Sequence, residues 1–133
     1  MGFTISMKKK SFIDIKKLKR NTRILLETEN TVFEILISGP KTSSVSVHGG
    51  IHFPRETKAV VYCVEKKRMK SAKVKHRMEK GIIRKGDCVQ FLFEDKNSLS
   101  SQEIITSSVL SATVFASDGS WSYDAIEKNE NTN

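Results

Sequence analysis

Ten lysine or arginine side chains within a stretch of twenty residues are the strongest chemical signal in this sequence. They lie between positions 66 and 85, where Glu79 is the one acidic residue. Lysine and arginine bind phosphate oxygens, and this density of cations is typical of segments that contact nucleic acid or another polyanion. The residues that we expect to bind a polyanion are Lys66, Lys67, Arg68, Lys70, Lys73, Lys75, Arg77, Lys80, Arg84 and Lys85.

A second basic segment, at positions 8–23, contains eight more lysines and arginines, with Asp14 as its one acid. The two segments together hold eighteen of the twenty-three basic residues, whereas the other positions carry five basic and thirteen acidic residues. The formal net charge is +8. Charge that is segregated in this way favours a surface for an anionic partner over a general contribution to solubility.

Residues that could support catalysis or metal binding are few and poorly spaced. His48 and His52 flank a Gly-Gly pair, and Cys63 and Cys88 belong to separate apolar stretches, so the four lack the paired spacing of a zinc site. No nucleophile elbow, phosphate-binding loop or dinucleotide fingerprint occurs. We therefore expect a protein that is not an enzyme and has no metal or cofactor. Unpaired cysteines in apolar strands fit a reducing cytoplasm.

The alternation of polar and apolar residues predicts β-strands over most of positions 23–115. The strands are expected at 23–28, 33–37, 44–48, 58–65, 88–93 and 104–115. Pro54 argues against a strand immediately before position 58, because proline cannot donate a backbone hydrogen bond. Many short strands without long helices indicate an all-β fold, a small antiparallel barrel of five to six strands.

Three regions are expected: a basic N-terminal arm at 1–21, a β-barrel domain at 22–115 and a polar tail at 116–133. In the arm, Phe12, Ile15 and Leu18 recur every three residues, which predicts a short basic amphipathic helix or arm that lies on the barrel as a lid. The composition of the tail predicts disorder. Trp121 and Tyr123 are its exceptions, since both could pack back onto the barrel. No run of about 18 apolar residues occurs, so no membrane span is expected.

Several short motifs appear in an order that resembles short, uncharacterised bacterial single-domain β-barrel proteins. This resemblance covers about residues 22–114, and it implies the fold and a bacterial, cytoplasmic origin but no activity. The motifs are Thr-Arg at 22–23, Thr-Glu-Asn at 28–30, Val-x-Val-x-Gly-Gly at 45–50, Phe-Pro at 53–54, Thr-x-Ala at 57–59, Gly-x-Ile-x-x-Gly at 81–86 and Ile-Thr-Ser at 105–107.

The chain is also similar, more faintly, to PilZ domains, which bind cyclic di-GMP through a basic R-x-x-x-R arm and a D/N-x-S-x-x-G turn. Ser46 and Gly49 match the turn, with Ser44 at the position of the acid or amide. Lys19 and Arg23 have the spacing of the arm, with lysine in place of the first arginine. An ammonium group does not replace the bidentate contact of a guanidinium, so we expect weak binding at best. The nucleotide-binding residues that this resemblance implies are Lys19, Arg20, Arg23, Ser46 and Gly49.

The leading hypothesis from the sequence is a non-catalytic small β-barrel that binds nucleic acid or another polyanion through the basic loop. Tyr62 or Phe53 would stack on bases if they were exposed, although the core is the more frequent place for such residues. The alternative is a PilZ-like module that binds a cyclic dinucleotide or a protein partner. Exposed aromatic side chains beside the basic loop would favour the first hypothesis, and a pocket between 19–23 and 46–49 would favour the second.

Overall fold

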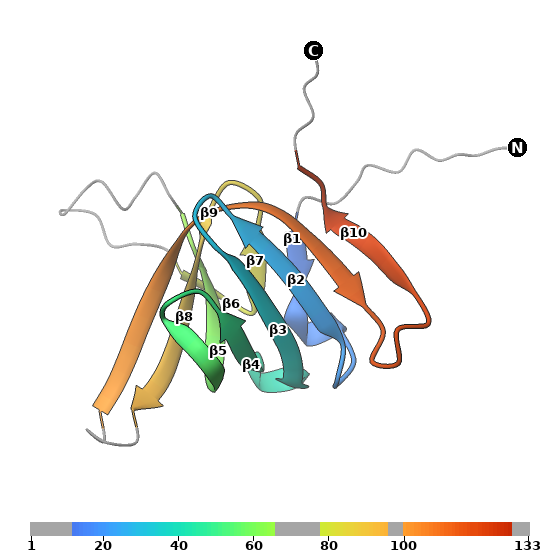
Figure 1. The fold of residues 1–133 in the computed structure, drawn as a ribbon. Helices are drawn as coiled ribbons and strands as arrows, with labels where there is room; N and C mark the ends of the chain where they lie inside the picture. Colours follow the sequence, from blue (N-terminus) through green and yellow to red (C-terminus); the bar gives the residue numbers. More distant parts are fainter. Residues whose placement is uncertain (1–11, 66–77, 96–99, 129–133) are drawn as a thin grey trace, which may run out of the picture.

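The structure, a computed structural model, describes residues 12–65, 78–95 and 100–128 (Figure 1). These residues form ten β-strands and two three-residue 3-10 turns, η1 (Ile15–Lys17) and η2 (Pro40–Thr42). The strand pairs are antiparallel. The all-β class predicted from the alternating pattern is therefore confirmed.

Six of the strands close into a barrel (Figure 1). They are β2 (Arg23–Thr28), β3 (Val32–Gly39), β4 (Ser44–Gly49), β5 (Phe53–Val64), β8 (Cys88–Asp95) and β9 (Ser100–Phe115). Each strand pairs with the next in that order, and β9 pairs with β2. Closure removes the unpaired edges that an open sheet would expose. The antiparallel barrel that the sequence predicted is confirmed, with six strands.

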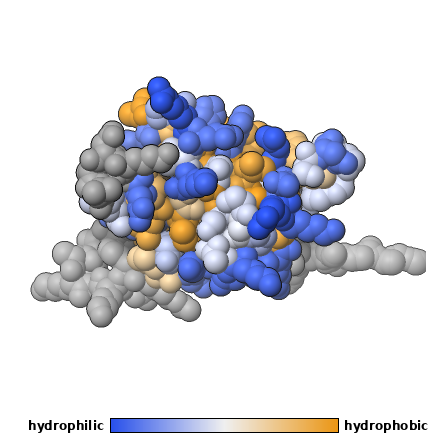
Figure 2. Space-filling view, turned by 90° about the horizontal axis from the view of Figure 1, so that it is seen from below, coloured by the Kyte–Doolittle hydropathy of each residue, from blue (hydrophilic) through white to orange (hydrophobic). Residues whose placement is uncertain are grey.

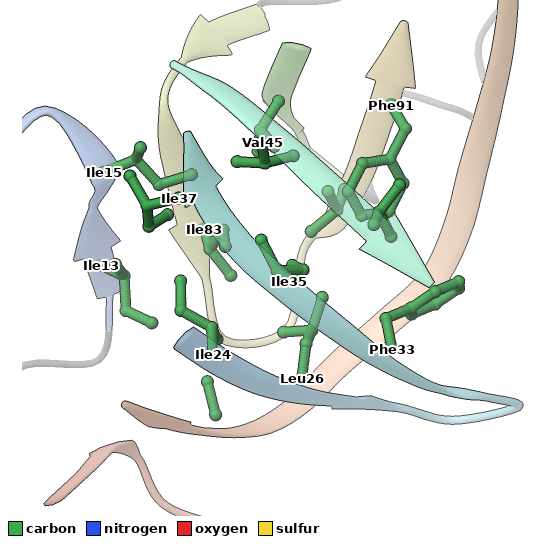
Figure 3. Close-up of a cluster of buried hydrophobic side chains, with 14 of the residues drawn as sticks. Ile13, Ile15, Ile24, Leu26, Phe33, Ile35, Ile37, Val45, Ile83 and Phe91 are labelled. Atoms are coloured by element: carbon green, nitrogen blue, oxygen red, sulfur yellow. The ribbon is translucent and has the colours of Figure 1, made fainter. Parts of the chain in front are cut away.

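The side chains that alternate inward along these strands fill the barrel. Figure 3 shows Leu26, Ile35 and Val45 from neighbouring strands pointing into one cluster. The rings of Phe33 and Phe91 approach to 5.6 Å between centroids at one end of this cluster. Burying a side chain of this size contributes about 1.5–3 kcal/mol. Hydrophobic burial along a period of two is thus what makes these segments strands rather than helices.

Strand β5 begins earlier than the sequence indicated. The prediction started this strand at position 58 because of Pro54, yet β5 begins at Phe53. Strand β8 pairs with β5 only from Val60 onward, so one edge of the first part of β5 has no strand partner among the described residues. Proline is tolerated at such an edge, where no ladder hydrogen bond is required of it.

The N-terminal arm does not form the amphipathic helix that its spacing suggested. Residues 12–14 form strand β1 (Phe12–Asp14), and the single 3-10 turn η1 follows it. Ile13 and Ile15 are both buried in the core, so the arm alternates with a period of two. The partner of β1 is β7 (Ile82–Arg84), a strand distant in the sequence. This tertiary pairing, together with the burial of two isoleucines, outweighs the local helical spacing.

The C-terminal region is also more ordered than its composition suggested. After a turn in which Gly119 adopts a φ of +78°, strand β10 (Ser122–Ile126) pairs with the last part of β9. The side chain of Ile126 is buried in the same core as the barrel residues. The prediction of a disordered tail is therefore wrong for 122–126, while residues 129–133 lie outside the described part of the chain.

Candidate functional site

The pairing of β1 with β7 brings the described parts of the two basic segments to one end of the barrel. Phe12 lies opposite Arg84 in this pair. The backbone N–H of Ile15 donates a hydrogen bond to the carbonyl oxygen of Gly81 at 2.8 Å. The N–H of Gly81 in turn donates to the carbonyl of Val61 in β5, also at 2.8 Å. The turn η1 is therefore fixed to the loop between β6 (Met78–Lys80) and β7, and through it to the barrel.

Six exposed basic side chains lie on or next to the elements that meet at this junction. They come from η1, from the residues that follow it, from η2, which lies against η1, and from the last residue of β6. Within the described chain, none of these six side chains forms an ion pair. We call this surface the basic end, and it consists of Lys16, Lys17, Lys19, Arg20, Lys41 and Lys80.

Backbone geometry keeps the basic end compact. Asp14 accepts a hydrogen bond at Oδ1 from the backbone N–H of Lys16, at 3.1 Å, and so caps η1. Gly81 has a φ of +79°, and a Cβ there would collide with Oγ of the buried Ser43 and lie 3.5 Å from Cε of Lys16. Glycine is therefore required where the two basic segments meet, since both the backbone conformation and the space exclude a side chain.

Most of the basic loop that the sequence singled out lies outside the described residues. This applies to Lys66, Lys67, Arg68, Lys70, Lys73, Lys75 and Arg77.

The three other residues of the basic loop lie in the described part of the chain. Lys80 is exposed at the basic end, whereas Lys85 donates a hydrogen bond to the carbonyl oxygen of Glu127. Arg84 binds Glu79 at 2.6 Å and lies over the ring of Phe12, 5.5 Å from its centroid. The hydrogen bond to Glu79 raises the pKa of Arg84. Arg84 and Lys85 therefore make contacts within the protein, whereas the exposed side chain of Lys80 forms no ion pair within the described chain.

A pocket of about 330 Å³ lies on the outer face of the barrel. Arg23 and Ser46, from the resemblance to PilZ domains, both line it, together with His48 and two carboxylates, Glu34 and Glu56. The complete lining is Arg23, Ile24, Leu25, Glu34, Ile35, Leu36, Ser46, His48, Glu56 and Phe115. Arg23 lies opposite Leu36 across β2 and β3, and Leu36 lies opposite Ser46 across β3 and β4, so the strand register places these residues in one row.

The other residues implied by that resemblance lie elsewhere. Lys19 and Arg20 belong to the basic end, and Gly49 ends β4 and pairs with Phe53. The structure thus brings together Arg23 and Ser46, two of the five residues, and adds two carboxylates that an anionic ligand would have to approach. The sequence offered no signal for Glu34 or Glu56, since both alternate outward along strands and look like ordinary surface residues.

The aromatic side chains divide into a buried group and an exposed pair. Phe53 is fully buried in the core and Tyr62 is half-buried, so Phe53 is not available to stack on a base. Trp121 and Tyr123 on and beside β10 are 48% and 50% exposed, and their rings stack with centroids 5.8 Å apart and an angle of 25° between planes. The signal that identifies them is the Trp-x-Tyr spacing after a Ser-Asp-Gly-Ser turn, which places both rings on one side of a strand.

The thiols and imidazoles do not gather into a reactive site. Cys63 and Cys88 are buried, and the Cys63 thiol lies 3.7 Å from Oδ2 of Asp87. Burial, and then the Asp87 carboxylate, raise the pKa of Cys63 to about 11, so this thiol is protonated at neutral pH. His52 is exposed between β4 and β5, whereas His48 lines the outer-face pocket. Across the described ranges, no three histidine, cysteine or carboxylate side chains group as metal ligands would.

The described surface also exposes apolar atoms between hydrophilic side chains, as Figure 2 shows from below. The large hydrophobic residues that contribute are Leu25, Val32, Ile51, Met78, Ile105, Trp121 and Tyr123. Between residues 12 and 128, with the gaps given above, no helix has the length and apolar character needed to cross a bilayer. Comparison of the chain with protein-family models, with curated proteins and with solved structures finds no match.

Proposed function

We propose that this protein is a non-catalytic β-barrel binding module that holds a polyanion, and nucleic acid in particular, at its basic end. The observation that carries this proposal is the Ile15–Gly81 hydrogen bond together with the β1–β7 pair. These contacts join parts of two basic segments that are far apart in the sequence. The cations of both segments thereby act on the same ligand.

The chemistry of the basic end suits contacts with phosphate groups. Five of its six members are lysines, whose ammonium groups are compact point charges on flexible stems. Such groups bind phosphate oxygens without reading bases. Because no acidic side chain within the described chain forms an ion pair with them, their positive charges can attract an anion. We therefore expect strong salt dependence and little preference for base sequence.

A pair of matched double variants tests the location of the site. Lys17→Glu with Lys80→Glu reverses two charges at the basic end, whereas Arg55→Glu with Lys58→Glu reverses two exposed charges on β5. Arg55 lies six residues before Val61, or about 20 Å along the strand from the basic end. Fluorescence anisotropy with a labelled oligonucleotide should show weakened binding only for the first variant. Equal weakening by both would mean that net charge, not the basic end, determines binding.

A second candidate function is the binding of a cyclic dinucleotide in the outer-face pocket. It is supported by Arg23 and Ser46, which line the same pocket. It is opposed by Glu34 and Glu56, because carboxylates repel the phosphates of such a ligand. We rank it below the polyanion proposal for this reason.

A further inference from the structure

Contacts other than those of the aromatic pair Trp121–Tyr123 anchor strand β10 to the rest of the protein. Ile126 is the residue of β10 that enters the core, and the Asp124 carboxylate accepts a hydrogen bond from Oγ1 of Thr113 at 3.0 Å. The backbone carbonyl of Trp121 accepts from the N–H of Ala116, which requires no particular side chain. The two large aromatic rings are about half-exposed beside these contacts.

Strand β10 extends the sheet beyond the barrel wall and so leaves one side of these rings open. Tyr123 lies opposite Val114 of β9, and directly opposed residues point to the same side of a sheet. Val114 is buried within the barrel, whereas Tyr123 lies one strand further out and stays half-exposed. Trp121 shares its side, as the stacking of the two rings confirms.

The same part of the molecule adjoins the basic end. Strand β10 contacts β1, and η1 follows directly from β1 (Figure 1). A nucleotide chain that contacts the basic end with its phosphates can therefore reach the aromatic pair with its bases.

We propose that Trp121 and Tyr123 form a base-stacking platform, and that the polyanion bound by this protein is single-stranded nucleic acid. This inference rests on the proposed function. Stacking on an aromatic ring requires bases that are not already stacked and paired, and it tolerates any base because each has a π face. A duplex hides its bases, and polyphosphate has none. The combination of cations and exposed aromatic rings therefore selects a single strand.

The chain contains one tryptophan, so its fluorescence reports directly on this platform. Titration with a short oligothymidylate should quench the fluorescence of Trp121, with a parallel rise in the anisotropy of the labelled oligonucleotide. An abasic oligomer of the same length presents the same phosphates without bases. It should bind with similar salt dependence but roughly 5- to 150-fold more weakly, the range expected for one stacked base, and without quenching.

Matched variants separate stacking from folding. Trp121→Leu with Tyr123→Leu keeps apolar side chains on the strand but removes both π systems, and it should weaken oligothymidylate binding to the level of the abasic oligomer. Ile51→Ala removes an 89% exposed apolar side chain in the turn between β4 and β5 and should change nothing. Circular dichroism and thermal unfolding of each variant confirm that the barrel is intact.

The outcomes distinguish this proposal from the one on which it rests. If the abasic oligomer or polyphosphate binds as tightly as oligothymidylate, and the fluorescence does not change, the stacking platform is wrong while polyanion binding stands. If a duplex of the same sequence binds more tightly than the single strand, the platform is also wrong. If no oligomer binds at low salt, both proposals fall.

Discussion

The backbone N–H of Ile15 donates a 2.8 Å hydrogen bond to the carbonyl oxygen of Gly81, and this bond ties the N-terminal arm to the barrel. This bond also determines where the basic side chains of η1 lie. Ile15 is fully buried and Gly81 is bonded to β5, so the position of η1 is determined by the core. The cations of η1 are therefore held beside Lys80 by the same contacts that stabilise the barrel.

Replacing Gly81 with alanine should destabilise the protein strongly. Gly81 has a φ of +79°, and an added Cβ would collide with Ser43 Oγ. The strained φ and the overpacking together should lower the free energy of unfolding by about 2–4 kcal/mol. Gly119→Ala is the matched control, because its φ is +78° but no heavy atom lies within 4 Å of the added Cβ. Urea unfolding should show a loss of only about 1–2 kcal/mol for the control. Equal losses would mean that the packing against Ser43 is unimportant.

Strand β10 should contribute to stability even though its surroundings in the sequence are polar. Ile126→Ala removes a buried side chain from the core and should lower the free energy of unfolding by about 2–5 kcal/mol. Val32→Ala, at a half-exposed position of β3, provides the comparison and should cost less than 1 kcal/mol, or about the value of a surface substitution. Thermal denaturation of both variants tests this, and an Ile126→Ala protein as stable as the wild type would support a disordered tail after all.

The stability of the protein should fall at high pH partly through Cys63. The pKa of this thiol is raised from 9.0 to about 11 in the folded state, so the folded state keeps the proton longer than the unfolded state does. The contribution is complete below pH 9 and is lost as the pH rises toward 11, by up to about 2–3 kcal/mol. Cys63→Ala removes this titration. The difference in unfolding free energy between wild type and variant should therefore shrink across this window, and a constant difference would contradict the assigned pKa.

The outer-face pocket should bind cyclic di-GMP no more tightly than about 10 μM, or about −7 kcal/mol. The physical reason is the pair of carboxylates, Glu34 and Glu56, that line the pocket with Arg23. Glu34→Gln with Glu56→Gln should strengthen whatever binding calorimetry detects in the wild type. Submicromolar binding to the wild type that disappears in Arg23→Ala would reverse the ranking of the two candidate functions.

The barrel could be predicted from the sequence because its signal is local. Ile24 and Leu26 alternate with outward residues, and a strand with one buried face must show that period. The spacing of Phe12, Ile15 and Leu18 favours a helix in the arm, while the pairing with β7 that decides the structure of residues 12–14 is distant in the sequence. Strand β10 could not be predicted either, because the residues around Trp121 are polar and the strand forms through its pairing with β9.

The sequence indicated most of the residues of the candidate site but not how the fold brings them together. Composition identified both basic segments, but the hydrogen bond between Ile15 and Gly81 that joins them accompanies the β1–β7 pair, which no local pattern encodes. The same holds for the outer-face pocket, where Arg23 and Ser46 share a row through the register of three strands. The contacts of Arg84 with Glu79 and of Lys85 with the carbonyl oxygen of Glu127 could not be predicted from the sequence either, because they depend on the tertiary fold.

The measurement that tests the central claim most directly is the salt dependence of single-strand binding by the wild-type protein. If about five cations contact phosphates, the plot of log affinity against log salt concentration should have a slope near −3.5, at about 0.7 per phosphate. The Lys17→Glu, Lys80→Glu variant should reduce the magnitude of this slope by about 1.4, while the Arg55→Glu, Lys58→Glu variant leaves it unchanged. The account is contradicted if the wild type does not bind even at about 20 mM salt, where screening is weak.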